Sequence, residues 1–366
     1  MKSKSILVLT LDAGGTNFVF SALKNGEVYG EKFTIKAEIQ DLELCITSII
    51  SGFNKLLSSL SEKPDAISFA FPGPSDYKQG VIGDLPNLPA FNGGIPLGPI
   101  LEDSFGIPVF INNDGDLFAL GESKKGFLPY INKLMELAEN PKRYKNLIGI
   151  TLGTGFGVGI SINGTLLEGD NNAAAEGWLL RNKQFNYAGV EETLSIRSIK
   201  RMYAEQISID PSKSPEPIEI YEIAKGNKPG VREAALEAYL RYGEALGDAI
   251  GNILTLIDGV VVIGGGVSGA YSIFSSSMMD ELNGYFTALN GINYKRVLQS
   301  VYDIEKPFRV KELLLADNKE ILVPQSRRKI VYHDKKKTAI GLSRLGTSNA
   351  VAIGAYYYAF QELFTK

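Results

Sequence analysis

The chain has 366 residues and a net charge of −3 at pH 7, with 44% hydrophobic and 22% charged residues. This size and composition are typical of a globular protein with two domains, and they give no net basic character of the kind that nucleic-acid-binding proteins carry. A single cysteine, Cys45, excludes an internal disulfide and a thiolate zinc cluster, and a single histidine, His333, leaves little basis for histidine-based metal sites or a Ser-His-Asp triad. Catalysis by such a chain is expected to use carboxylates.

The sequence also limits where the protein is expected to work. No stretch approaches the length of a membrane-spanning helix, and the apolar run after Lys2 and Lys4 meets Asp12 too early to be a signal peptide. We therefore expect a cytoplasmic protein with no membrane association. The basic triplet at residues 335–337 is expected to be a short solvated loop.

The first motif is a strand, a turn and a second strand within residues 5–20. An apolar run predicts a buried strand, which is interrupted by Asp12 and then by Gly14, Gly15 and Thr16 before alternation resumes. A tight hairpin turn is one interpretation. A phosphate site is the other, because amides free of side chains can bind phosphate oxygens while a carboxylate handles a hydrated cation.

Strand and helix patterns then alternate, which predicts an α/β sheet. Helical periodicity at residues 42–60 precedes an apolar strand at 65–71, and a further strand at 108–111 ends on Asn113 and Asp114. Polar residues where a strand gives way to a helix are where open α/β sheets bind ligands. The alternative is that Asn113 or Asp114 simply caps the helix that follows.

A second copy of the opening pattern occurs at residues 147–162. An apolar strand breaks on Gly153, Thr154 and Gly155 about 140 residues after the first turn, and a repeat of this kind suggests two related halves. Both halves would then carry a turn with the composition of a phosphate cradle.

A third glycine-rich turn follows the apolar strand at 260–263 and contains Gly264, Gly265 and Gly266. A dinucleotide site would need a further strand ending in an acidic residue about 20 residues later, and the sequence has a helical pattern there. Such a turn can instead hold a nucleotide base and ribose against bare backbone. Before it, a long helix is predicted at 231–257, with a stripe of glycines that permits close packing.

These motifs, in this order, resemble those of the sugar-kinase, Hsp70 and actin superfamily. The Asp12 turn is similar to its first phosphate motif, the Gly153 turn to its second, and the Gly264 turn to its adenosine motif. Within the superfamily the chain resembles the ROK family of bacterial sugar kinases, repressors and open reading frames. The stretches that carry this resemblance are Pro72-Gly73-Pro74, Pro86-Asn87-Leu88-Pro89, Asn113-Asp114 leading to Gly121-Glu122, and residues 350–355.

The resemblance implies two ribonuclease-H-like (actin/hexokinase-type) domains that flank a central cleft. The smaller would comprise residues 1–115 with 350–366, and the larger residues 116–349. It also implies ATP-dependent phosphorylation of a hydroxyl of a hexose or hexose derivative, with Asp114 as the general base. The sugar would contact Gly73, Asn87, Asn113, Asp114, Glu176 and Glu191. The phosphates would contact Gly14, Gly15, Thr16, Thr154 and Gly155, the adenosine Gly265 and Gly266, and Mg²⁺ would lie at Asp12 through water.

Two departures from the family pattern concern the sugar side. The family usually has a histidine shortly after the residue that matches Glu176, and a cysteine cluster that binds zinc together with that histidine. Here Trp178 stands near the histidine position and the cysteines are missing, so we expect ATP and Mg²⁺ but no structural zinc. A sugar-binding or sensing ROK protein without kinase turnover is the alternative function. The expected partner is a small sugar and not a nucleic acid, and a homodimer is one option for the oligomeric state.

Overall fold

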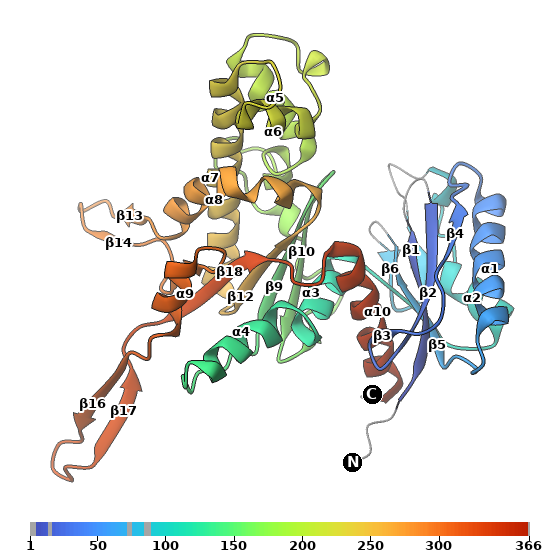
Figure 1. The fold of residues 1–366 in the computed structure, drawn as a ribbon, viewed down its shortest axis with the longest axis horizontal. Coiled ribbons are helices and arrows are strands. Elements are labelled where there is room, and N and C mark those ends of the chain that lie inside the picture. Colours follow the sequence, from blue (N-terminus) through green and yellow to red (C-terminus); the bar gives the residue numbers. More distant parts are fainter. Residues whose placement is uncertain (1–4, 14–16, 72–74, 84–88, 365–366) are drawn as a thin grey trace. The chain divides into compact units, whose positions relative to one another are not determined.

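The computed structural model describes residues 5–13, 17–71, 75–83 and 89–364. The chain divides into two compact units, which are described separately (Figure 1). Unit 1 comprises Met1–Gly126, Gly159–Ala175 and Arg344–Lys366, and unit 2 comprises Phe127–Val158 and Glu176–Ser343. Among the described residues, no helix combines the length and the apolar character needed to cross a membrane.

Unit 1 is built on a six-stranded sheet with the strand order β3-β2-β1-β5-β8, and β4 pairs with β2. The strands are β1 (Leu7–Ala13), β2 (Asn17–Lys24), β3 (Glu27–Val28), β4 (Phe33–Lys36), β5 (Ala66–Ala70) and β8 (Val109–Asn112). The strands β1 to β4 pair antiparallel, whereas β1, β5 and β8 run parallel to one another. The parallel strands therefore end at one edge of the sheet.

Helix α1 (Leu42–Ser59) covers one face of this sheet. It begins where the Asp41 side chain accepts a hydrogen bond from the Leu44 amide at 2.9 Å, as an N-cap residue does. Its buried face includes Cys45 and Phe53, and the Phe53 ring meets Phe20 of the sheet edge-on at 5.0 Å. Burial raises the pKa of the Cys45 thiol to about 11, so Cys45 is a core residue, as predicted, and not a nucleophile.

Two further helices, α3 (Asp114–Lys124) and α10 (Thr347–Phe364), pack closely against each other in unit 1. Glycines allow the approach, since a Cβ on Gly121 would collide with the Ala350 carbonyl and one on Gly354 with the Leu117 carbonyl. This contact assigns α3 to unit 1, whereas the sequence-based division placed everything from residue 116 to 349 in the other domain. The difference arises because the helix pair joins segments more than 200 residues apart.

Unit 1 is completed by short elements that follow β5 and precede β8. They are β6 (Ser75–Asp76), β7 (Val81–Ile82), the 3-10 helix η1 (Pro89–Phe91) and α2 (Leu97–Phe105). Helix α2 ends at Gly106, whose φ of 62° is the left-handed C-cap conformation that glycine adopts readily.

A second six-stranded sheet has the order β11-β10-β9-β12-β18-β15. It belongs to unit 2 except for β11 and the part of β10 from Gly159 onward, which fall within the residue range of unit 1. Its strands are β9 (Leu147–Leu152), β10 (Phe156–Ile162), β11 (Thr165–Leu166), β12 (Val260–Gly264), β15 (Ser300–Asp303) and β18 (Lys337–Leu342). The strands β9, β12, β18 and β15 run parallel. In both sheets the first strand of the glycine-turn hairpin, β1 or β9, also pairs with a parallel strand on its other side. The repeated architecture and the α/β class are therefore both confirmed.

The helices of unit 2 are α4 (Phe127–Leu137), α5 (Ile196–Gln206), α6 (Pro217–Lys225), α7 (Arg232–Leu256), α8 (Tyr271–Leu282) and α9 (Pro307–Leu314). The 3-10 helices are η2 (Gly177–Leu179), η3 (Val190–Glu192), η4 (Pro211–Lys213) and η5 (Gly266–Ala270). The predicted glycine stripe of α7 does permit close packing, because Cβ atoms on Gly243 and Gly247 would collide with backbone carbonyls of α8. Helix α8 also occupies the place where a dinucleotide-binding fold would need a strand.

Two small hairpins branch from unit 2: β13 (Tyr285–Thr287) with β14 (Asn293–Lys295), and β16 (Asn318–Leu322) with β17 (Lys329–His333). The prediction of a solvated loop at 335–337 is wrong for Lys337, which lies in β18 and is 6% exposed. Its ammonium donates hydrogen bonds to the carbonyls of Glu312 at 2.8 Å and Leu315 at 3.0 Å and pairs with Asp317, which offsets the cost of burial.

Candidate functional site

The parallel strands of unit 1 bring two predicted site regions to one sheet edge. Leu9 of β1 is in register with Ile67 of β5, which is in register with Val109 of β8. Because the strands are parallel, residues three positions further along each strand are also level with one another, so Asp12 lies at the same level as Asn112. The carboxylate of Asp12 and the residues directly after β8 therefore lie at the same edge, two strands apart.

Asn113 and Asp114 form the N-terminus of α3. Both side chains accept a hydrogen bond from the Gly115 amide at 2.8 Å, and Asn113 is the N-cap. The capping interpretation is therefore correct for Asn113, but it leaves its amide nitrogen and the second Asp114 oxygen for other partners. Asp114 keeps solvent access at the helix N-terminus, so it can reach a ligand.

Protein atoms surround the Asp114 carboxyl closely even though solvent reaches the residue. Desolvation raises its pKa above the ordinary value of 3.8, the Gly115 amide opposes this shift, and the negative charge of Asp12 adds to it. A carboxyl in a concave surface can be both accessible to solvent and poorly hydrated. A raised pKa makes the carboxylate a better proton acceptor.

The side chain of Asn112 forms a layer beneath this site. Its carbonyl oxygen accepts from the Asn113 amide at 2.7 Å, and Glu168, 3.5 Å from its amide nitrogen, accepts from the Tyr358 hydroxyl at 2.8 Å. Asn112 is 2% exposed, so this network fixes the backbone from which Asp114 projects. The other predicted residues of this region, Gly14, Gly15, Thr16, Gly73 and Asn87, lie outside the described residues.

In unit 2 the second and third glycine turns lie next to each other. Strands β9 and β12 are parallel, with Thr151 in register with Gly264, so the turn at Thr154 and Gly155 and the turn at Gly265 and Gly266 leave the same sheet edge. Gly265 has a φ of +87°, and a Cβ there would collide with the Leu152 backbone. A Cβ on Gly266 would meet nothing within 4 Å. The edge thus presents open backbone, which suits an extended anionic ligand.

The carboxylate of Glu191 lies against the second glycine turn. It accepts a hydrogen bond from the Phe156 amide at 3.2 Å, and a Cβ on Gly155 would collide with the same carboxylate oxygen. Arg197 stands 3.6 Å from the other oxygen. Residues 35 positions apart along the chain are therefore in contact at the predicted phosphate turn.

Glu176 lies on a neighbouring segment that also borders the start of β10. The indole N–H of Trp178 donates a hydrogen bond to its carboxylate. Gly177 packs against Phe156 and Val158, and Ala175 has a φ of +61°, a conformation that costs energy for a residue with a side chain. The Trp178 indole therefore holds the carboxylate, and the backbone on each side of Glu176 is fixed by close packing and by a constrained conformation.

Sequence reasoning did not identify Asn182, which holds this region together. Asn182 is 2% exposed, and its amide nitrogen donates to the Gly189 carbonyl at 3.1 Å and to the Thr193 hydroxyl at 3.0 Å. Its oxygen accepts from the Gln184 and Phe185 amides at 2.8 and 3.0 Å. One buried amide therefore closes the loop 182–193. An isolated asparagine gives no sequence signal for such a role.

No group of three or more His, Cys, Asp or Glu side chains able to hold a metal occurs within the described ranges. Asp12, exposed at the end of β1, is a single hard oxygen donor. This fits Mg²⁺, which retains several waters and usually takes one or two protein carboxylates together with substrate phosphates.

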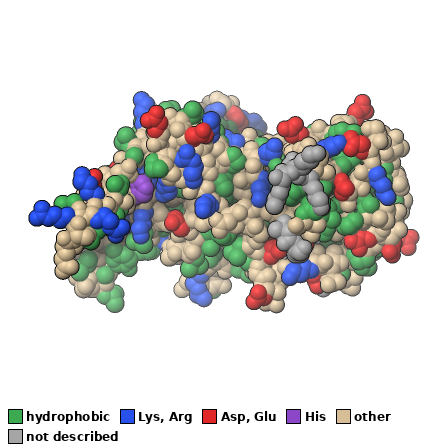
Figure 2. All heavy atoms as spheres, turned by 90° about the horizontal axis from the view of Figure 1, so that it is seen from below, with side chains coloured by type: hydrophobic (Ala, Val, Ile, Leu, Met, Phe, Trp, Pro, Cys, Tyr) green, Lys and Arg blue, Asp and Glu red, His purple; other side chains and the backbone are tan. Residues whose placement is uncertain are grey.

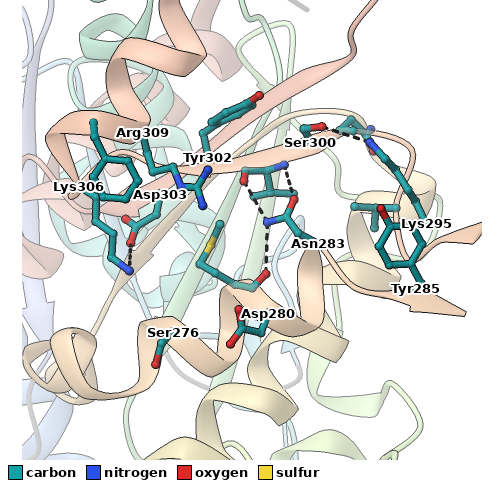
Figure 3. Close-up of a pocket in the computed structure, with 15 residues that line it drawn as sticks. Ser276, Asp280, Asn283, Tyr285, Lys295, Ser300, Tyr302, Asp303, Lys306 and Arg309 are labelled. Atoms are coloured by element: carbon teal, nitrogen blue, oxygen red, sulfur yellow. Dashed lines mark hydrogen bonds and ion pairs between the residues drawn. The ribbon is translucent and has the colours of Figure 1, made fainter.

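A cavity of about 400 Å³ lies elsewhere in unit 2, between α8, β15 and α9 (Figure 3). None of the predicted site residues lines it. Two of its basic groups already have acidic partners, since Lys306 lies 3.8 Å from Asp303 and Arg309 lies 2.8 Å from Glu312. We therefore do not assign the reaction to this cavity.

Comparison with known proteins agrees with the motif order. The model of the ROK family matches residues 8–308. The solved structure of a glucokinase from Parabacteroides distasonis is 46% identical, with a TM-score of 0.87 and 98% of each chain covered. An N-acetyl-D-glucosamine kinase from Photobacterium profundum is 26% identical over 275 residues, which cover 70% of this chain and 83% of that protein. A ROK glucokinase from Streptomyces griseus, solved with glucose and AMPPNP, shares the fold at 18% identity and a TM-score of 0.61, with 97% and 99% covered. The protein therefore belongs to the ROK family.

Proposed function

We propose that the protein is an ATP-dependent sugar kinase that phosphorylates a hydroxyl of a hexose or hexose derivative. The main observation behind this proposal is the position of Asp114. Its carboxyl lies at a helix N-terminus, directly after a parallel strand, and has a raised pKa. The similarity to a glucokinase and to an N-acetyl-D-glucosamine kinase supports the same reaction class.

Asp114 would act as the general base. Its carboxylate takes the proton of the sugar hydroxyl while that oxygen bonds to the γ-phosphorus of ATP and the bond from this phosphorus to ADP breaks. Phosphoryl transfer depends mainly on alignment and on neutralising the phosphate oxygens, so one carboxylate is enough for the proton. The Gly115 amide and the Asn112 layer keep the Asp114 side chain oriented.

The glycine turns of unit 2 would bind the nucleotide. The turn at Thr154 and Gly155 offers amides to the phosphates, as would Gly14, Gly15 and Thr16 of unit 1, and the open backbone at Gly265 and Gly266 would accept the adenosine. Asp12 would hold Mg²⁺ through water, and this ion would supply neutralising charge at the phosphates.

Sugar hydroxyls would be bound by Asn113, Glu176 and Glu191, together with Gly73 and Asn87. Trp178 is 43% exposed and has two effects here, because its N–H orients the Glu176 carboxylate while its ring offers an apolar face. Aromatic faces suit the C–H side of a sugar ring, so Trp178 is a specificity residue in this proposal.

A coupled assay of ADP release over a panel of hexoses, N-acyl hexosamines and other sugars tests the proposal. We expect turnover on at least one sugar and its loss in the Asp114→Ala variant. Absence of turnover on every sugar, or equal rates for wild type and variant, would contradict it. Mass spectrometry of the product then identifies the phosphorylated sugar.

Trp178 in the place of the family histidine favours a second candidate, a sugar-binding ROK protein without turnover. Calorimetry distinguishes the two. Tight sugar binding with no ADP release, in the presence of Mg²⁺ and ATP, would support this candidate and exclude the kinase.

A further inference from the structure

The strands β16 and β17, with the residues that follow them, form a projecting segment that we call the arm (residues 318–336). Its two strands pair only with each other, and all ten strand residues are exposed. Figure 1 shows the arm extending away from α9 and β18, the elements of unit 2 that it connects. Two-stranded hairpins without a covering layer are marginally stable in water. Packing against another surface would therefore stabilise the arm.

One face of the arm is apolar. Ile321 is in register with Ile330, and Lys319 with Tyr332, so these four side chains share a face. The exposed fractions of Ile321, Ile330 and Tyr332 are 50%, 37% and 38%. No described residue outside the arm shields them to the degree found in the cores of the two units.

The opposite face of the arm has a different character. There Val331 lies across from Glu320, and Leu322 lies across from Lys329, so each apolar side chain has a charged neighbour. Glu320 and Lys329 themselves form an ion pair at 2.7 Å. Val331 and Leu322 are 61% and 55% exposed, so this face also presents apolar surface, but each of its apolar side chains lies across from a charged one. The face with Ile321 and Ile330 differs because it places two apolar side chains directly opposite each other, and this pair is the part of the arm that we assign to a partner.

The arm also carries a charge opposite to that of the whole chain. It has six Lys or Arg and two Asp or Glu, a net charge of +4 in a chain of −3. Arg327 and Arg328 at its tip make no ion pair with any described residue, and Figure 2 shows basic side chains gathered at this end of unit 2. The arm is thus both apolar on one face and cationic at its tip.

The compensating negative charge belongs almost entirely to unit 1. Unit 1 holds 12 Lys or Arg and 18 Asp or Glu, a net charge of −6, and unit 2 without the arm carries −1. Two arms would repel each other, because both are cationic. We infer that the arm of one copy docks its apolar face on unit 1 of a second copy, where its tip arginines meet acidic side chains.

Nucleic acid is the other partner that a cationic segment could attract. A phosphate backbone would engage Arg327 and Arg328, but it offers nothing to an apolar stripe of two isoleucines and a tyrosine. A protein surface that is acidic and partly apolar satisfies both features. The inference does not depend on the sugar or on turnover.

Sedimentation velocity of the full-length protein from 1 to 100 μM tests the inference. We expect wild type to associate in 50 mM NaCl and to weaken in 500 mM NaCl, since the charged contacts are screened. The Ile321→Thr/Ile330→Thr variant is expected to raise the dissociation constant at least tenfold. Val331→Thr makes the same kind of change on the opposite face and serves as the matched control, with association unchanged.

A charge variant keeps the test valid if the isoleucine variant unfolds. Arg327→Glu/Arg328→Glu lies at the exposed tip, and it is expected to weaken association and to abolish the effect of salt. A monomeric wild type at 100 μM, or wild-type association in both double variants, would overturn the inference. So would a monomeric protein that binds a fluorescent DNA or RNA duplex through the arm.

Discussion

The replacement Asp114→Asn separates the chemical role of this residue from its structural role. Asparagine has nearly the same shape, and its side-chain oxygen can still accept the Gly115 amide hydrogen bond of 2.8 Å. The α3 N-terminus and its Asn113 cap should therefore be retained. What is lost is the carboxylate that would accept the proton of the sugar hydroxyl.

A positioned general base contributes about 10²- to 10⁴-fold to rate, so we expect kcat to fall by that factor while the KM values change little. This corresponds to about 3–5 kcal/mol of activation free energy. The coupled ADP-release assay measures it. Asp103→Asn, an exposed acid at the end of α2, makes the same chemical change outside the site and should keep wild-type activity.

Stability gives a second, independent result for Asp114→Asn. Because the folded protein raises the pKa of this carboxyl above 3.8, the native state holds the proton more tightly than the unfolded chain. Stability therefore falls as pH rises from the unfolded pKa to the folded pKa, and the ionised group remains unfavourable at pH 7. The variant lacks this charge, so its Tm at pH 7 should equal or exceed that of wild type, and the difference should vanish below about pH 3.8.

The reasoning fails if the Asp114→Asn variant keeps more than a tenth of the wild-type kcat, because Asp114 would then not be the base. It also fails if the Tm at pH 7 drops while activity is lost. In that case the carboxylate stabilises the fold, and the loss of rate reports damage to the site. Differential scanning calorimetry at pH 7 and at a pH below 3.8 decides between these outcomes.

Three further changes test the surroundings of the site and the packing behind it. Trp178→Phe removes the N–H that holds Glu176, so the KM for the sugar should rise about 5-fold with kcat nearly unchanged. Trp178→His should restore part of the lost sugar affinity, whereas equal KM values for wild type and Trp178→Phe in steady-state kinetics would contradict this role. Asn182→Ala removes four hydrogen bonds within a buried loop, so it should lower the free energy of unfolding by about 2–4 kcal/mol in urea titrations and should also lower kcat/KM. A free energy of unfolding within about 0.5 kcal/mol of wild type, the size of an ordinary surface change, would exclude Asn182 as the residue that anchors the loop. Gly354→Ala adds a Cβ that meets the Leu117 carbonyl and should cost about 1–3 kcal/mol, seen as a lower Tm, whereas Ser51→Ala on the exposed face of α1 should be neutral or slightly stabilising.

Much of the fold follows from local patterns in the chain. Apolar runs that end on Asp12, on Asn113 and on Gly153 predict strands that stop at polar or glycine turns, and parallel pairing then brings such ends to one sheet edge. The helix at 42–60 and the long helix at 231–257 follow from their periodicity in the same way. Periodicity succeeds here because it reports which side of a single element is buried.

The contacts that complete the site could not be predicted, because they join segments with no shared local pattern. The hydrogen bonds from Trp178 to Glu176 and from Phe156 to Glu191, and the closure of a loop by Asn182, depend on how whole segments pack against β10. The burial of Lys337 is of the same kind, since a lysine in a basic triplet is solvated unless distant carbonyls surround it. Local sequence determines where strands and helices begin and end, whereas the partners of a buried polar group are set by the sum of packing over the whole unit.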